Sequence, residues 1–85
     1  MKNDIKVIEK DTETHYCNTV RINSSQEEVF LDFGVNRPSE SGLVVELNDR
    51  VAMNYFTAKR LVLNLGQHLR AFEEKHGKVD LSTKE

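Results

Sequence analysis

The triplet Asp32-Phe33-Gly34 could carry chemistry, because it matches the motif whose aspartate binds magnesium in protein kinases. A kinase also needs a glycine-rich loop, a strand lysine and a catalytic loop, and the 85 residues contain none of these. We therefore interpret the triplet as structural: Phe33 faces the core, Asp32 faces outward, and Gly34 ends a strand by letting the backbone turn. This interpretation predicts that Phe33→Ala destabilises the fold by about 3 to 5 kcal/mol and that Asp32→Asn changes stability little.

Histidine and cysteine side chains are the candidate metal ligands. His15 and Cys17 are two residues apart and would project from the same face of a strand. Two ligands do not complete a zinc site, which would then need a second subunit. His68 and His76 are separated by about 12 Å along a helix and cannot share an ion. We expect no metal, and no cofactor either, because no glycine-rich phosphate-binding motif occurs.

Nucleophilic catalysis would need a serine beside a base that a third group holds. The serines lie instead in predicted turns, a loop and a tail, at positions 24, 25, 39, 41 and 82. We predict that they stabilise turns, that the chain has no catalytic residue, and that the protein is not an enzyme.

Lys59, Arg60 and Arg70 make the predicted helix the most basic part of the chain. The acidic pair Glu73-Glu74 follows them, and mixed signs at helical spacing are typical of a solvated face. The net charge of -2 supplies no general attraction for nucleic acid or for anionic lipid. We expect no nucleic-acid partner, while a small nucleic-acid-associated regulator that uses these three cations stays an alternative.

The size and composition indicate one domain with a thin core, which assembly with another subunit would help to complete. The single cysteine cannot form an intramolecular disulfide, and no apolar run is long enough for a membrane span or a signal peptide. We expect a cytoplasmic bacterial protein without membrane contact. Its organisation is predicted as an N-terminal arm over residues 1–14, flexible or forming an edge strand, a domain over 15–81 and a tail over 82–85.

Alternating apolar residues predict three strands, over residues 15–23, 28–34 and 43–53. The first two are close enough in sequence to form an antiparallel hairpin, and residues 35–42, with the only proline, are predicted to form a loop. Asp49 interrupts the apolar side of the third strand. An aspartate at such a position indicates a bend, a bulge or a hydrogen-bonded edge.

A helix is predicted from the N-cap residue Asn54 to the C-terminal cap Gly77. Its apolar stripe should cover one face of the sheet, and the stripe consists of Ala58, Leu61, Val62, Leu65, Leu69 and Phe72. Phe56 and Leu63 lie on the opposite side of the helix and are predicted to contact another subunit, together with Lys59, Arg60 and Arg70. Scattered exposure of these apolar residues is the simpler alternative. The predicted fold is α+β, with an antiparallel sheet of three to four strands followed by one long C-terminal helix packed on one face.

In order along the chain, several short motifs resemble the domain-of-unknown-function family numbered three-four-six-seven. They are Y-x-N-x-V-x-I from Tyr16, VFLDFG from Val29, RVAMN from Arg50, AKRL from Ala58 and FEEKHG from Phe72. The resemblance covers about residues 15–80, and Asn54-Tyr55 stands where we would expect Ser-Pro in this family. Such membership implies no known activity and no catalytic residues.

A looser resemblance, in topology alone, is to the SecB-type export chaperone. The function that we predict is a non-catalytic homo-oligomeric binding or assembly module, a dimer or larger, with a possible further protein partner. A SecB-like chaperone or peptide-binding protein is the other alternative.

Overall fold

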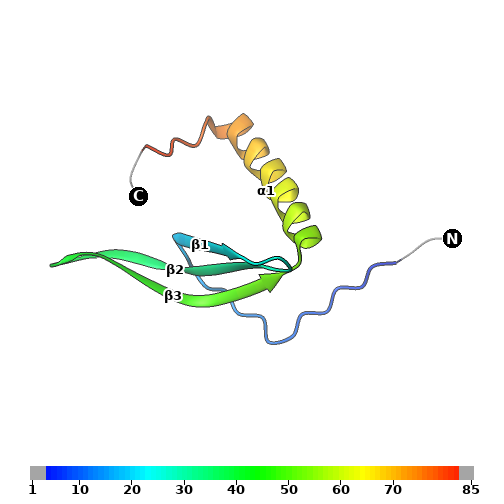
Figure 1. The fold of residues 1–85 in the computed structure, drawn as a ribbon. Helices are drawn as coiled ribbons and strands as arrows, with labels where there is room; N and C mark the ends of the chain where they lie inside the picture. The colour runs from blue at the N-terminus through cyan, green and yellow to red at the C-terminus, as the bar shows by residue number, and fades with distance from the viewer. Residues whose placement is uncertain (1–3, 83–85) are drawn as a thin grey trace.

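The computed structural model describes residues 4–82 and contains three strands and one helix. Strands β1 (Thr19–Ser24), β2 (Val29–Ser39) and β3 (Gly42–Met53) form one antiparallel sheet in the order β1-β2-β3, and helix α1 (Tyr55–His76) follows (Figure 1). The predicted α+β arrangement of an antiparallel sheet and one C-terminal helix is confirmed. Residues 1–3 of the predicted arm and 83–85 of the predicted tail lie outside the described residues.

The first hairpin joins β1 to β2 through a serine turn. The Ser25 hydroxyl accepts hydrogen bonds from the backbone N–H groups of Glu27 and Glu28, at 3.2 and 3.1 Å. The backbone N–H of Ser25 also donates to the carbonyl of Glu28 at 2.9 Å. The predicted antiparallel hairpin is therefore present, although β1 begins at Thr19 and leaves residues 15–18 outside the strand.

The second hairpin is longer than predicted, because β2 continues past Gly34 to Ser39 and only two residues separate β2 from β3. The prediction of a loop over residues 35–42 was wrong. Pro38 is compatible with the strand here because the pairing with β1 reaches only as far as Gly34, where β1 begins, so that the rest of β2 is an edge on that side. Gly42, with φ of 127°, supplies the backbone conformation that the tight turn needs.

A β-bulge lies where β2 passes from Phe33 to Gly34. Phe33 pairs with Asp49 but Gly34 pairs with Leu47, so β3 has one extra residue at this point. The irregularity that Asp49 indicated in the sequence is thus confirmed as a bulge. A Cβ at Gly34 would lie 1.9 Å from the carbonyl oxygen of Glu46. The glycine is required for close approach of two backbones, and it does not end the strand.

Helix α1 has the predicted bounds because both of its ends are capped locally. The Asn54 side-chain oxygen accepts a hydrogen bond from the backbone N–H of Thr57 at 2.8 Å. At the other end, the Gly77 N–H donates to the carbonyl of Glu73 at 2.8 Å. The caps place the whole helix between Asn54 and Gly77.

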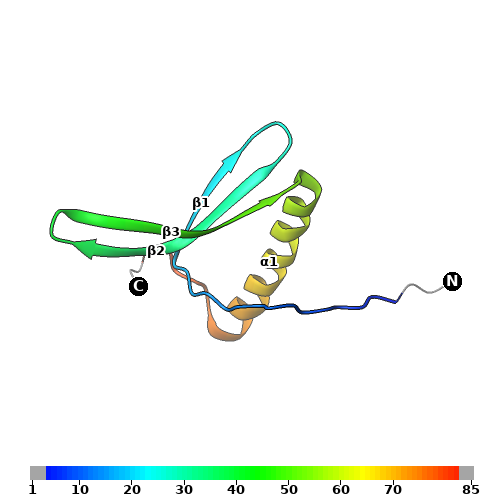
Figure 2. The same ribbon diagram turned by 90° about the horizontal axis from the view of Figure 1, so that it is seen from below.

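The helix does not cover the sheet within one chain. It rises from the end of β3 and leans away from the strands (Figures 1 and 2), and none of its residues is buried. Its first turn is attached to the β1–β2 turn, where the Tyr55 hydroxyl donates to the carbonyl oxygen of Ser25. The predicted packing of the apolar stripe on a sheet face is therefore not observed in the isolated chain. Asn54 is the single residue between β3 and α1, and this short link together with the Tyr55 hydrogen bond determines the direction of the helix relative to the sheet.

The buried part of the described chain is small and includes a charge. Val29 and Leu31 are its only buried apolar side chains, and both belong to the central strand β2. Phe33, which was predicted to face the core, is only half-buried. Asp32, which was predicted to be an outward residue with little effect on stability, is 1% exposed and is the most buried side chain. Asp32 does point to the side opposite Leu31 and Phe33, as predicted, but its neighbours bury it there, and the expected small effect of Asp32→Asn stays an untested prediction.

Candidate functional site

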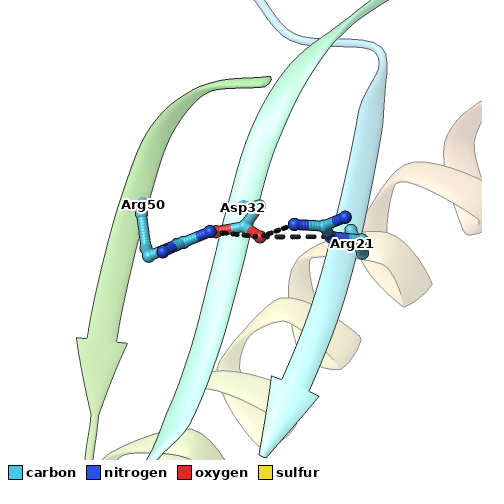
Figure 3. A network of polar contacts seen from close by, with 3 residues as sticks. All are labelled: Arg21, Asp32 and Arg50. Carbon is cyan, nitrogen blue, oxygen red and sulfur yellow. Dashed lines mark hydrogen bonds and ion pairs between the residues drawn. The ribbon is translucent and has the colours of Figure 1, made fainter. Parts of the chain in front are cut away.

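Asp32 lies between two arginines on the face of the sheet opposite Leu31 and Phe33. The register places Arg21 of β1 and Arg50 of β3 directly across from Asp32 of β2 (Figure 3). Arg50 Nε donates to Asp32 Oδ1 at 2.6 Å, and Arg21 Nη2 donates to Asp32 Oδ2 at 2.9 Å. Arg21 Nε and Arg50 Nη2 add longer bonds to Oδ2, at 3.2 and 3.4 Å. One carboxylate thus joins all three strands.

Asp32 and Arg50 stabilise each other's charged forms. Hydrogen bonds from Arg50 and then Arg21 lower the pKa of the Asp32 carboxyl, against the opposing effect of its burial. The same contact with Asp32 raises the pKa of Arg50. Both oxygens of the carboxylate accept hydrogen bonds, so Asp32 is poorly suited to act as a base or as a metal ligand. The arrangement is a structural ion pair of the sheet.

Sequence reasoning assigned Arg21, Asp32 and Arg50 to the outward sides of their strands and still missed this cluster. These three residues were assigned to the correct sides, although the bulge reverses the alternation of β3 before Asn48, and the cluster itself depends on the register between strands. A signal was nevertheless present, since an outward acidic residue on a middle strand with an outward arginine on each neighbour favours such a pairing.

His15 forms a second polar cluster, on the bulged part of the sheet. Its Nδ1 is 2.9 Å from Asp49 Oδ2, and its Nε2 is 3.0 Å from Glu13 Oε1. Hydrogen bonds to Asp49 and then Glu13 raise the pKa of His15. The Asp49 carboxylate that interrupts the apolar pattern is thus bonded, as its position in β3 indicated.

The neighbourhood of His15 is a shallow hollow of about 550 Å³, lined by Asp11, Glu13, His15, Cys17, Phe33, Asp49, Arg50 and Val51. His15 and Cys17, which were predicted to share one face of a strand, both line this hollow, but they precede β1 and lie outside any strand. Both imidazole nitrogens already have carboxylate partners, and the described residues contain no cluster of three or more side chains suited to a metal ion. The cluster attaches residues 13–15, which precede β1, to β3.

The predicted interface residues all lie exposed on α1. Phe56 and Leu63 are 76% and 59% exposed, and Lys59, Arg60 and Arg70 are exposed as well. Phe56, Lys59 and Arg60 line a second hollow beside Tyr55 at the start of the helix, whereas Leu63 and Arg70 do not belong to it. The structure therefore brings only part of the predicted set together.

The main stripe of the helix is also exposed, which the sequence did not indicate. We use "helix stripe" for four of its residues, Leu61, Leu65, Leu69 and Phe72, whose exposed fractions range from 38% to 53%. The sheet has an apolar face of its own, on the side that Leu31 and Phe33 share. We use "sheet face" for its exposed residues Val20, Ile22 and Val51; Ile22 and Val51 lie across from Leu31, on either side of it.

Within the described residues, no helix combines the length and the apolar character that crossing a membrane requires. Comparison with known proteins finds a match over residues 2–81 to the family described as "Protein of unknown function (DUF3467)". No curated protein and no solved structure matches the chain. The match spans the whole of the sheet and helix described above, including the LDFG segment and the AKRL helix start. The chain belongs to the DUF3467 family of proteins of unknown function.

Proposed function

We propose that this protein is a non-catalytic assembly module that completes its hydrophobic core by associating with further copies of itself. The observation that carries the proposal is the exposed area of the single chain. The chain exposes 8349 Å², whereas a compact monomer of the same mass exposes about 5200 Å². Its radius of gyration is 16.6 Å, and a compact chain of this length has one of about 12 Å.

The difference in area is large enough for a permanent interface. The excess of about 3000 Å² in one chain exceeds the roughly 1000 to 2500 Å² that each subunit buries in an obligate homodimer. Several of the exposed apolar residues are also grouped on two surfaces, the helix stripe and the sheet face. These two surfaces were predicted to cover each other. Because they do not meet within one chain, we propose that a second copy covers them.

The absence of catalysis in this proposal is supported by the partners of the titratable groups. Asp32 is bonded to two arginines, and His15 is bonded to two carboxylates. Each group is held in a contact that links elements of the fold. We place the module in the cytoplasm of a bacterial cell, which the single unpaired cysteine, Cys17, supports.

Leu65→Asp tests the helix stripe through the mass measured by sedimentation velocity. Leu65 is about half exposed. If association buries the exposed half of the side chain, it contributes about 1 kcal/mol per copy to the free energy of association, or about 2 kcal/mol in a symmetric dimer. Loss of that contact weakens association at least about 30-fold. Asn64→Asp is the matched control, because it adds the same charge one residue away at a position that is already polar.

Leu63→Asp tests the predicted second face in the same experiment. If Leu63 and Phe56 contact another subunit, this variant also dissociates, and the assembly uses both sides of the helix. A wild-type mass of 9.8 kDa at every concentration would contradict the proposal. An oligomer that neither leucine variant weakens would contradict the part assigned to the helix.

Binding of extended peptides is the second candidate function, and the open sheet favours it. In the described sheet the outer edges of β1 and β3 have no partner strand, and exposed apolar side chains lie nearby. A free edge beside apolar surface can accept an extended peptide as an additional strand. Suppression of the aggregation of several unfolded client proteins would support this function. If the oligomer suppresses the aggregation of none of them, and a hydrophobic dye does not bind its apolar surfaces, the result would argue against peptide binding.

A further inference from the structure

The N-terminal arm, residues 4–18, crosses the sheet and leaves it on the side of β3. At its inner end, the Asn18 N–H donates to the carbonyl of Gly34 at 3.0 Å, and the Asn18 side chain pairs with the backbone of Asn36 on β2. Three residues earlier, His15 is bonded to Asp49 on β3. Since β2 lies between β1 and β3, the arm passes over the central strand between these two anchors.

Beyond His15 the arm turns away from its own sheet. Asp11 has φ of 47°, a left-handed conformation that changes the direction of the chain. Residues 4–10 then extend away from the strands in both views (Figures 1 and 2). They form no strand in the described structure, so the arm is not a fourth strand of its own sheet.

The outer part of the arm carries apolar side chains that are largely exposed and that no other described residue buries. Ile5, Val7 and Ile8 are 89%, 78% and 68% exposed. Over residues 4–7, Ile5 and Val7 alternate with the charged residues Asp4 and Lys6, which is the pattern of a strand with one buried side, and the alternation ends at Ile8. Seven extended residues span about 23 Å, enough to pair along most of a strand.

We propose that residues 4–10 pair as an added strand with the outer edge of β3 in a second copy of this chain. β3 suits this role because it has 12 residues against six in β1. It also presents exposed apolar side chains at Leu43, Val45 and Val51. The arm leaves its own domain on the β3 side, so a twofold pair with the two β3 edges facing each other places each arm beside its partner. The arms then exchange, and the backbone groups of both edges gain partners.

This inference rests on the proposed self-assembly and adds the segment that passes between copies. Hydrogen–deuterium exchange of the full-length chain, read for residues 4–10 at low and at high protein concentration, tests it. The wild-type amides should exchange at least about tenfold more slowly at the high concentration, where copies are associated. Val7→Ser should abolish that protection, and Lys6→Ser, on the other side of the arm, should keep it.

The outcomes separate this inference from the proposed function. An oligomer whose residues 4–10 exchange at unprotected rates at every concentration would overturn arm exchange and leave self-assembly intact. Protection that persists at a concentration where the measured mass is that of the monomer would overturn arm exchange too, because the arm would then be covered by its own chain. A chain that stays monomeric throughout would overturn both.

Discussion

Gly34→Ala is expected to be among the most destabilising single-methyl changes in this protein. The added Cβ would lie 1.9 Å from the carbonyl oxygen of Glu46 and 2.8 Å from Leu47 Cα. Real Cβ contacts essentially never fall below 3.0 Å, so the two strands must separate by about 1.1 Å at the bulge. All three of the nearest atoms belong to the backbone, and no side-chain rotation can relieve the clash.

The expected loss of stability is about 3 to 5 kcal/mol. Overpacking contributes about 1 to 3 kcal/mol, and the loss of about two ladder hydrogen bonds beside the bulge contributes about 1 kcal/mol each. For a domain of this size that corresponds to a fall in Tm of about 12 °C or more. Thermal unfolding followed by circular dichroism, with wild type and variant at the same protein concentration, measures it.

Gly66→Ala is the matched control for this prediction. Gly66 lies inside α1, and apart from its chain neighbours and the surrounding helix backbone no atom lies within 4 Å of the position that a Cβ would take. The same substitution should therefore stabilise the helix, by about 0.5 to 1 kcal/mol. Equal Tm values for Gly34→Ala and wild type would refute the close approach of β2 and β3 at the bulge. A large loss at Gly66 would show that another copy packs against that part of the helix.

Three further predictions concern the polar contacts. Asp32→Asn should lower Tm more than Glu46→Gln, which removes an exposed ion pair, and equal effects at neutral pH would contradict the buried cluster. Because folding lowers the pKa of Asp32, the stability that its carboxylate contributes is present above the unfolded value of 3.8 and is lost as the pH falls through the folded value. Because folding raises the pKa of His15, its contact with Asp49 stabilises the fold below about pH 6.5, and this stabilisation is lost as the pH rises through the raised value. An NMR titration should show a lower His15 pKa in Asp49→Asn than in wild type, and an unchanged pKa would show that the arm is not attached there. Asn54→Ala should cost about 1 kcal/mol in urea unfolding through loss of the helix cap, and no change would mean that the cap is made by another group.

The features that could be predicted from the sequence are those determined by neighbouring residues. Asn54 and Gly77 define the helix because capping involves only the adjacent turns. Asp49 marked the bulge because a carboxylate on the apolar side of a strand needs a local explanation. The turn at Ser25 likewise depends on a short polar segment.

The features that could not be predicted depend on the pairing of distant segments. Asp32 is buried because the register brings Arg21 and Arg50 to its two sides, and no single strand carries that information. Pro38 suggested a loop, although a proline is acceptable on the part of β2 that β1 does not reach.

The helix stripe shows a different limit of sequence reasoning. The spacing of Leu61, Leu65 and Leu69 indicates that this side of α1 becomes buried, and the periodicity does not state against which surface. The expectation that the stripe covers the same chain's sheet was the simplest choice for one domain. In the isolated chain these side chains are about half exposed, and for that reason we assign their cover to a second copy.

The concentration dependence of Tm tests the central claim, that folding of the core is completed by association. If subunits bury the helix stripe and the sheet face against each other, dilution favours the unfolded chain by mass action and Tm rises steadily with protein concentration. Leu65→Asp should reduce that rise, and Asn64→Asp should not. A cooperative transition with the same Tm at every concentration, from a particle of 9.8 kDa, would contradict the account.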